Sequence, residues 1–248
     1  MKDMKSDFKM RIEEIKELVK REFKPYLDSR LCLDGIINDE EYFNTDPKIL
    51  WILKEPYGGI ENELCDIPNE LNKAPSDFII GKPTWQEISY ITWSIFNNFT
   101  PYNKIPDYWD NDHDDEIGVV ADYLKKIAFI NIKKIAGGTS SKSSIIQEYY
   151  NKYKVILEKQ IKEFEPNIVI LGGTLKYFGD DLYGDNLKDS TDYNDTCHFI
   201  RNGQLFIDAQ HPAQRFSKEI YANTIIDIVK RWENGNRKVV TSPVSSSI

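Results

Sequence analysis

Four short apolar runs constrain the fold of this chain more than any other feature. Each is bounded by proline, glycine or polar residues and is too short for a buried helix. Such runs are typical of strands buried on both faces of a parallel sheet. They are residues 49–54 (ILWILK), 127–132 (IAFINI), 167–171 (NIVIL) and 204–208 (QLFID). A hairpin partner for the last run is predicted at 197–201 (CHFIR), because Asn202-Gly203 between them favours a tight turn.

Helical patterns lie between these runs. Residues 3–24 repeat apolar side chains at three- and four-residue steps and stop at Pro25. Residues 84–98 open with Thr84 and Glu87 at the spacing of a capping box. The alternation predicts an α/β fold, a three-layer α/β/α sandwich with a central, mainly parallel four-stranded sheet. Further helices are expected at 117–126, 140–164 and 216–233.

The composition fits one soluble domain. The chain has 248 residues, and its 40% hydrophobic content is enough for a core. We expect a cytoplasmic monomer, because no apolar run reaches bilayer length and the N-terminal residues lack the apolar stretch of a signal peptide. The predicted organisation is an N-terminal helical segment packed on the core (1–47), the α/β domain (48–235) and a disordered tail (236–248).

The net charge and the cysteine content restrict the functions that this chain could have. A net charge of −8 argues against a general duplex-coating protein, although it leaves room for a local basic groove. The acidic run at 107–116 is expected to be a solvated loop. Cys32, Cys65 and Cys197 are widely spaced and form no CxxC pair, so we predict reduced thiols, with no metal and no cofactor.

Each buried run ends in a polar or glycine-rich feature. Glu55 follows the first run, Asn131 lies in the second, Gly172-Gly173 follows the third and His211-Pro212 the fourth. Each feature alone also suits a structural role: an exposed turn carboxylate, a loop amide, a tight turn or a structural histidine. The carboxyl ends of parallel strands meet at one edge of the sheet, where ligands bind. The combination therefore favours a functional site at that edge.

A phosphate-loop-like segment occupies residues 136–143 (AGGTSSKS), after a strand and at the start of a helix. The nucleotide-binding pattern needs glycine immediately before the lysine, and here Ser141 precedes Lys142. ATPase activity is therefore not expected. Backbone N–H groups and serine hydroxyls at the helix start could still bind a single phosphate.

Taken together, these loops resemble the motifs of the uracil-DNA glycosylase superfamily over roughly residues 48–216. The segment KEPYGG resembles the first motif, with Glu55 in the place of the water-activating aspartate and Tyr57 in the place of the tyrosine beside the base. The strand ending at Asn131 matches the one whose asparagine reads the base edge. The Gly172-Gly173 turn and His211-Pro212-Ala213 resemble the later motifs. The chain departs from the pattern at Glu55, because the family has the shorter aspartate at this position.

The resemblance implies a DNA glycosylase-like enzyme that hydrolyses the N-glycosidic bond of uracil or a related modified base, as in base-excision repair. Glu55 and His211 would be catalytic. DNA, single- or double-stranded, or a free nucleobase or nucleotide would be the partner. Base-binding residues would be Asn131, Tyr57, Pro56, Phe78 and Trp85, and phosphate-binding residues Ser140, Ser141, Lys142 and Arg215.

Two other functions stay open at this point. The same fold could serve as a non-catalytic module that binds a nucleobase, a nucleotide or nucleic acid. A different α/β hydrolase could use Glu55 and His211, but no Gly-x-Ser-x-Gly segment is present, which disfavours serine-esterase chemistry. The spacing of His113, His198 and His211 does not favour metal-dependent hydrolysis.

Overall fold

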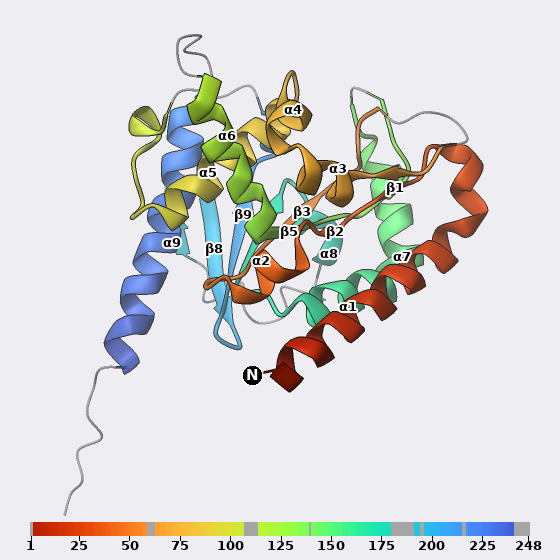
Figure 1. Ribbon diagram of the computed structural model, residues 1–248, viewed down its shortest axis with the longest axis horizontal. Coiled ribbons are helices and arrows are strands. Elements are labelled where there is room, and N and C mark those ends of the chain that lie inside the picture. The colour runs from red at the N-terminus through yellow and green to blue at the C-terminus, as the bar shows by residue number, and fades with distance from the viewer. Residues whose placement is uncertain are drawn as a thin grey trace, which may run out of the picture.

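A computed structural model describes residues 2–58, 63–106, 114–138, 140–179, 191–193, 196–214 and 217–240. Within these residues the protein is an α/β structure with helices on both faces of a mixed sheet (Figure 1). The sheet has seven strands in the order β2-β5-β3-β6-β9-β8-β7. Their bounds are β2 (Gly35–Ile36), β3 (Ile49–Leu53), β5 (Ile127–Asn131), β6 (Ile168–Gly172), β7 (Thr191–Tyr193), β8 (Thr196–Arg201) and β9 (Gln204–Ala209).

The α/β class predicted from the sequence is confirmed, but the predicted four-stranded sheet is incomplete. Strands β5, β3, β6 and β9 pair in parallel, as their continuous apolar character predicts. Three antiparallel strands extend them: β2 beside β5, and β8 and β7 beyond β9. A separate parallel pair joins β1 (Cys32–Leu33) to β4 (Cys65–Asp66). Strands of two or three residues are too short to show a hydrophobic period.

The inner strand β3 is buried on both faces, and its side chains divide between two cores. Trp51 and Leu53 contact the core beneath one layer of helices, and Leu50 and Ile52 contact the other. One layer contains α3 (Ile67–Lys73), α4 (Pro75–Ile79), α5 (Pro83–Phe96), α6 (Asp114–Asp122) and α9 (Lys218–Val240). The other contains α1 (Lys2–Phe23), α2 (Asp39–Asn44), α7 (Ser143–Phe164) and α8 (Leu175–Phe178).

The predicted helices are present, with shifted ends. The helix predicted at 117–126 is α6 followed by a 3-10 turn (Tyr123–Lys126), α7 begins three residues later than predicted, and α9 runs on to Val240. Residues 236–240, predicted as the start of a disordered tail, are therefore helical, and the rest of that predicted tail lies outside the described residues. No helix in the described ranges combines the length and apolar character needed to span a membrane.

The predicted capping box at the start of α5 is wrong. The helix begins one residue earlier, at Pro83, and its N-cap residue Lys82 makes no side-chain capping hydrogen bond. Proline suits the first helical position because its fixed φ is already helical and its missing N–H would be unpaired there. Glu87 is consequently free of a capping role and lies buried instead.

The predicted hairpin turn between β8 and β9 is confirmed. Asn202 has φ 51° and Gly203 has φ 80°, so both central residues are left-handed, as in a type I′ turn. The segment predicted as an N-terminal helical appendage also does more than pack on the core. It contributes β2 to the sheet, where Gly35 is in register with Phe129.

Candidate functional site

The four predicted features lie at one edge of the sheet, at the carboxyl ends of β3, β5, β6 and β9. Leu53 and Asn131 are in register on adjacent strands, so the loop carrying Glu55 emerges beside Asn131. His211 follows β9, two strands from β3 in the sheet order. At the usual interstrand spacing, the ends of β3 and β9 are about 10 Å apart, which is comparable to the width of a nucleoside.

Gly173 has a left-handed backbone conformation at the centre of this edge. Its φ is 69°, and its N–H donates to the carbonyl of Ala209 at 2.7 Å. A β-carbon at this position would lie 3.4 Å from Nζ of Lys54 and 3.5 Å from the backbone nitrogen of His211. The left-handed φ therefore favours glycine here, since a β-carbon would make only ordinary van der Waals contacts with Lys54 and the His211 loop.

Glu55 forms an ion pair that sequence reasoning missed. Nζ of Lys133, just beyond β5, donates a hydrogen bond to Oε2 of Glu55, and the Glu55 side chain is only 8% exposed. A β-carbon at Gly137 would overlap the Glu55 carboxyl group, so a larger residue there would displace this carboxylate from its present position. Gly137 N–H also donates to Pro56 at 2.9 Å. The loops after β3 and β5 are thus joined around the Glu55 carboxylate.

A buried network holds the end of β5. The Asp34 carboxylate accepts the backbone N–H of Asn131 at 2.7 Å and binds Nζ of Lys134 at 2.6 and 2.8 Å. Gln160 donates to the same carboxylate at 3.0 Å. The side chains of Asp34 and Lys134 have no exposed surface. Burial lowers the pKa of Lys134, and Asp34 opposes that shift.

Asn131 itself is buried by this arrangement. Its carbonyl accepts from Nζ of Lys134 at 3.3 Å. Because side chains alternate along a strand, its amide shares the face of β5 that carries Ile127 and Phe129, toward α5. The network under the strand therefore fixes the backbone from which the Asn131 amide projects.

His211 is held as a neutral imidazole. Its Nδ1 accepts the backbone N–H of Ala213 at 3.2 Å, which places the proton on Nε2. Burial, together with the positive charge of Lys54, lowers the pKa of His211 to about 4. Gln214 N–H donates to the His211 carbonyl at 2.8 Å, and Tyr221 donates to the Gln210 carbonyl at 2.8 Å. Nε2–H is thus an uncharged donor on a fixed loop.

The aromatic residues predicted to contact a base lie in different settings. Tyr57 is 75% exposed and follows the buried Pro56. Trp85 is buried and packs edge-on against Phe129 of β5, with ring centroids 4.8 Å apart. Phe78 is half-buried, and Nζ of Lys82 lies 3.5 Å from its ring centroid. Tyr57 is therefore the most accessible ring of the three, whereas Trp85 belongs to the core.

Three of the four predicted phosphate-binding residues lie at the start of α7. Lys142 is the N-cap residue of the helix and is exposed, as is Ser140, while Ser141 is half-buried. The next residue, Ser143, is 3.3 Å from Nζ of Lys176 on α8, which adds a second cation there. Arg215 lies outside the described residues.

Comparison of the sequence with models of known protein families and with proteins of curated function gives no match. Among the residues that the structure describes, no group of three or more His, Cys, Asp or Glu side chains is placed to hold a metal ion.

Proposed function

We propose that the protein is a DNA glycosylase-like hydrolase that cleaves the N-glycosidic bond of uracil or a related modified base. The observation that supports this best is the neutral His211 at the end of β9, two strands from the carboxylate of Glu55. A departing base becomes an anion. An uncharged Nε2–H can donate a hydrogen bond to that anion where its charge develops.

Glu55 and Asn131 suit the other two tasks of this reaction. Bond cleavage leaves positive charge on the sugar, which a carboxylate stabilises while it orients water. Lys133 would fix the position of one oxygen of the Glu55 carboxylate through their hydrogen bond. The Asn131 amide offers both a donor and an acceptor to a pyrimidine edge. A duplex substrate would have to flip the base out of the stack.

Base release from oligonucleotides tests this proposal. Single- and double-stranded substrates carrying uracil or modified bases are incubated with the wild type, Glu55→Gln, His211→Ala and the exposed control Glu148→Gln. We expect release by the wild type and the control, with losses of at least roughly 100-fold in the other two. Absence of release, or release at the wild-type rate by Glu55→Gln and His211→Ala, would rule the function out.

A second function has its own support. The Glu55 carboxylate is already paired with Lys133 and is only 8% exposed, which suits a fixed wall as well as a catalyst. The protein would then be a module that binds a nucleobase or nucleotide without cleaving it. Calorimetry with free bases and nucleotides separates the two, because saturable binding without base release from any substrate supports the module.

A further inference from the structure

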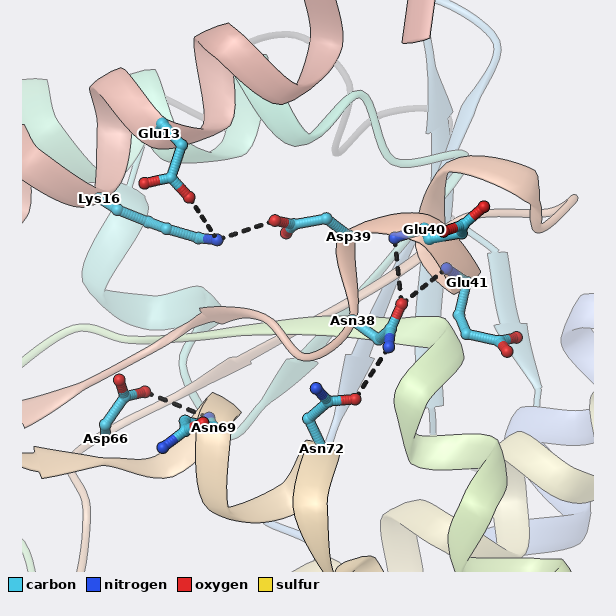
Figure 2. Close-up of polar contacts among 9 residues, drawn as sticks. All are labelled: Glu13, Lys16, Asn38, Asp39, Glu40, Glu41, Asp66, Asn69 and Asn72. Atoms are coloured by element: carbon cyan, nitrogen blue, oxygen red, sulfur yellow. Dashed lines mark hydrogen bonds and ion pairs between the residues drawn. The ribbon is translucent and has the colours of Figure 1, made fainter. Parts of the chain in front are cut away.

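Lys16 and Lys152 show two ways in which this protein holds an ammonium group at its surface. Lys16 on α1 lies between Glu13 at 3.1 Å and Asp39 at 2.9 Å, as Figure 2 shows, so carboxylates balance its charge. Nζ of Lys152, which is exposed on α7, donates instead to the hydroxyl oxygen of Tyr26 at 2.8 Å. No carboxylate among the described side chains lies within ion-pair distance of Lys152. Its positive charge is therefore available to an anion.

The hydroxyl group of Tyr26 adds a second donor beside this ammonium. Because its oxygen accepts from Lys152, the hydroxyl proton can turn toward a further acceptor. The hydrogen bond from Lys152 lowers the pKa of Tyr26, and the nearby hydroxyls of Tyr153 and Tyr149 lower it further. A phenol with a lowered pKa is a stronger hydrogen-bond donor. Lys152 and Tyr26 thus offer two adjacent donors to one acceptor group.

Aromatic rings surround these two donors. Tyr26 lies in the 3-10 helix that follows α1 (Lys24–Ser29), and its ring centroid is 6.2 Å from that of Tyr149 on α7. The buried Phe23 supports the group from below, with its centroid 4.1 Å from that of Tyr153. Tyr26 and Tyr149 are only half-buried, so each ring keeps surface that a ligand can reach. Aromatic rings beside cations are groups on which unpaired nucleobases stack.

The cluster is continuous with the strand-end edge that carries Glu55. Nζ of Lys133, which binds Glu55, lies 5.9 Å from the ring centroid of Tyr149. On its other side the Glu55 carboxyl group lies against Gly137, which forms a β-bridge with the exposed Tyr57. One series of contacts therefore leads from Tyr57 past Glu55 to Tyr149. A nucleic acid strand with one base at Glu55 would run on to the Tyr149 ring.

We propose that Tyr26, Tyr149 and Lys152 form a subsite for single-stranded nucleic acid. Lys152 and the Tyr26 hydroxyl bind a backbone phosphate, and the Tyr149 ring stacks on a neighbouring base. A single strand suits the rings better than a duplex, because its base faces are accessible without unpairing, and a net charge of −8 disfavours a broad duplex footprint. The target base at Glu55 rests on the proposed function, whereas the contacts of the subsite do not.

Fluorescence anisotropy with a labelled thymidine oligonucleotide tests the subsite without base release, since this strand carries no uracil. We expect the single strand to bind more tightly than its duplex with the complementary adenosine strand. Lys152→Gln should weaken binding roughly fivefold and reduce the slope of log affinity against log salt by about 0.7, the value for one phosphate contact on a single strand. The matched control Lys162→Gln, exposed in the last turn of the same helix, should change neither quantity.

A second pair of variants separates stacking from charge. Tyr149→Leu removes the ring and should weaken binding roughly tenfold with an unchanged salt slope, whereas Tyr149→Phe keeps the ring and should bind like the wild type. Tighter binding of the duplex, no binding of the oligonucleotide, or wild-type affinity and salt slope in Lys152→Gln would each overturn the subsite. Oligonucleotide binding that depends on Lys152, without base release from any substrate, would support the subsite and rule out the glycosylase.

Discussion

Lys133 and Glu55 follow neighbouring parallel strands and meet as an ion pair over the edge of the sheet. Both side chains are largely buried, at 12% and 8% exposure. Removing either partner would leave the other charge with little water around it. The ion pair therefore holds together the loops after β3 and β5. It does so at the carboxylate on which the proposed chemistry depends.

Lys133→Met should lower the free energy of unfolding by about 3 kcal/mol at neutral pH, because it leaves the Glu55 carboxylate buried and unpaired. Combining it with Glu55→Gln should recover part of the loss, since no charge then remains. Urea denaturation measures both, with the exposed Lys142→Met as control. If Lys133→Met and Lys142→Met are equally stable, the ion pair contributes nothing in solution.

The His211 imidazole should titrate near pH 4 and not near its ordinary 6.5. Below pH 6.5 the unfolded chain binds a proton at this imidazole that the folded protein does not bind. The free energy of unfolding therefore falls as the pH falls from 6.5 to 4. NMR titration of the ring reads the pKa directly. Lys54→Met should raise it, because a neighbouring positive charge is removed. Titration of the wild type at 6.5 would contradict the buried neutral state.

Lys134→Met should destabilise the fold by about 3–5 kcal/mol, because Asp34 would remain as a buried charge with no exposed surface. The double variant Asp34→Asn with Lys134→Met should lose less than the single variant, since both charges are gone. Thermal and urea unfolding measure the three free energies. A double variant as unstable as Lys134→Met would show that the hydrogen bonds to Asp34, and not the charge, carry the effect.

The parallel strands could be predicted from the sequence because their apolar runs are continuous and sharply bounded. The charged partners around the site could not be predicted, because they are brought together by contacts between residues that lie far apart in the sequence. Lys133 and Lys134 are adjacent and read as surface charge. In the structure one binds Glu55 and the other binds Asp34, 100 positions away. No local pattern distinguishes these two lysines from exposed ones.

Glu87 illustrates the opposite error. Here the sequence contains a local pattern, the capping box, but the helix is not capped by it. Its spacing from Thr84 matches a capping box, yet Pro83 starts the helix and moves the cap to Lys82. The Glu87 side chain is then fully buried, and Lys218 and Tyr221 of α9 are its electrostatic neighbours. Helix packing, which no short motif encodes, determines its environment.

Glu87 should make stability fall as the pH rises through the range from 4.5 to 7. Burial raises its pKa from 4.5 to about 7. Within that range the unfolded chain releases the proton while the folded protein keeps it. The full effect is about 3 kcal/mol, at roughly 1.4 kcal/mol for each pKa unit. Glu87→Gln should remove this slope and be more stable than the wild type at pH 8, and unchanged pH dependence of urea unfolding in this variant would contradict the assignment.

Cys32 and Cys65 should form a disulfide when the protein is treated with hydrogen peroxide. The two residues are in register on β1 and β4, and adjacent strands bring Cα atoms to about 5 Å, within the range that a disulfide spans. Both thiols are free, and a hydrogen bond from Cys32 lowers the pKa of Cys65. The Cys65 thiolate is thus the first target of the oxidant.

Oxidation of Cys65 gives a sulfenic acid and water, and the Cys32 thiol then displaces a second water to close the disulfide. Mass spectrometry should find the loss of two hydrogens and one cross-linked peptide pair, reversible by a thiol reductant. Cys65→Ser should abolish the cross-link, whereas Cys197→Ser should not, because Cys197 lies on β8. A wild-type protein in which Cys197 reacts first, or in which Cys65 proceeds to sulfinic acid without a cross-link, would show that the two thiols do not meet in solution.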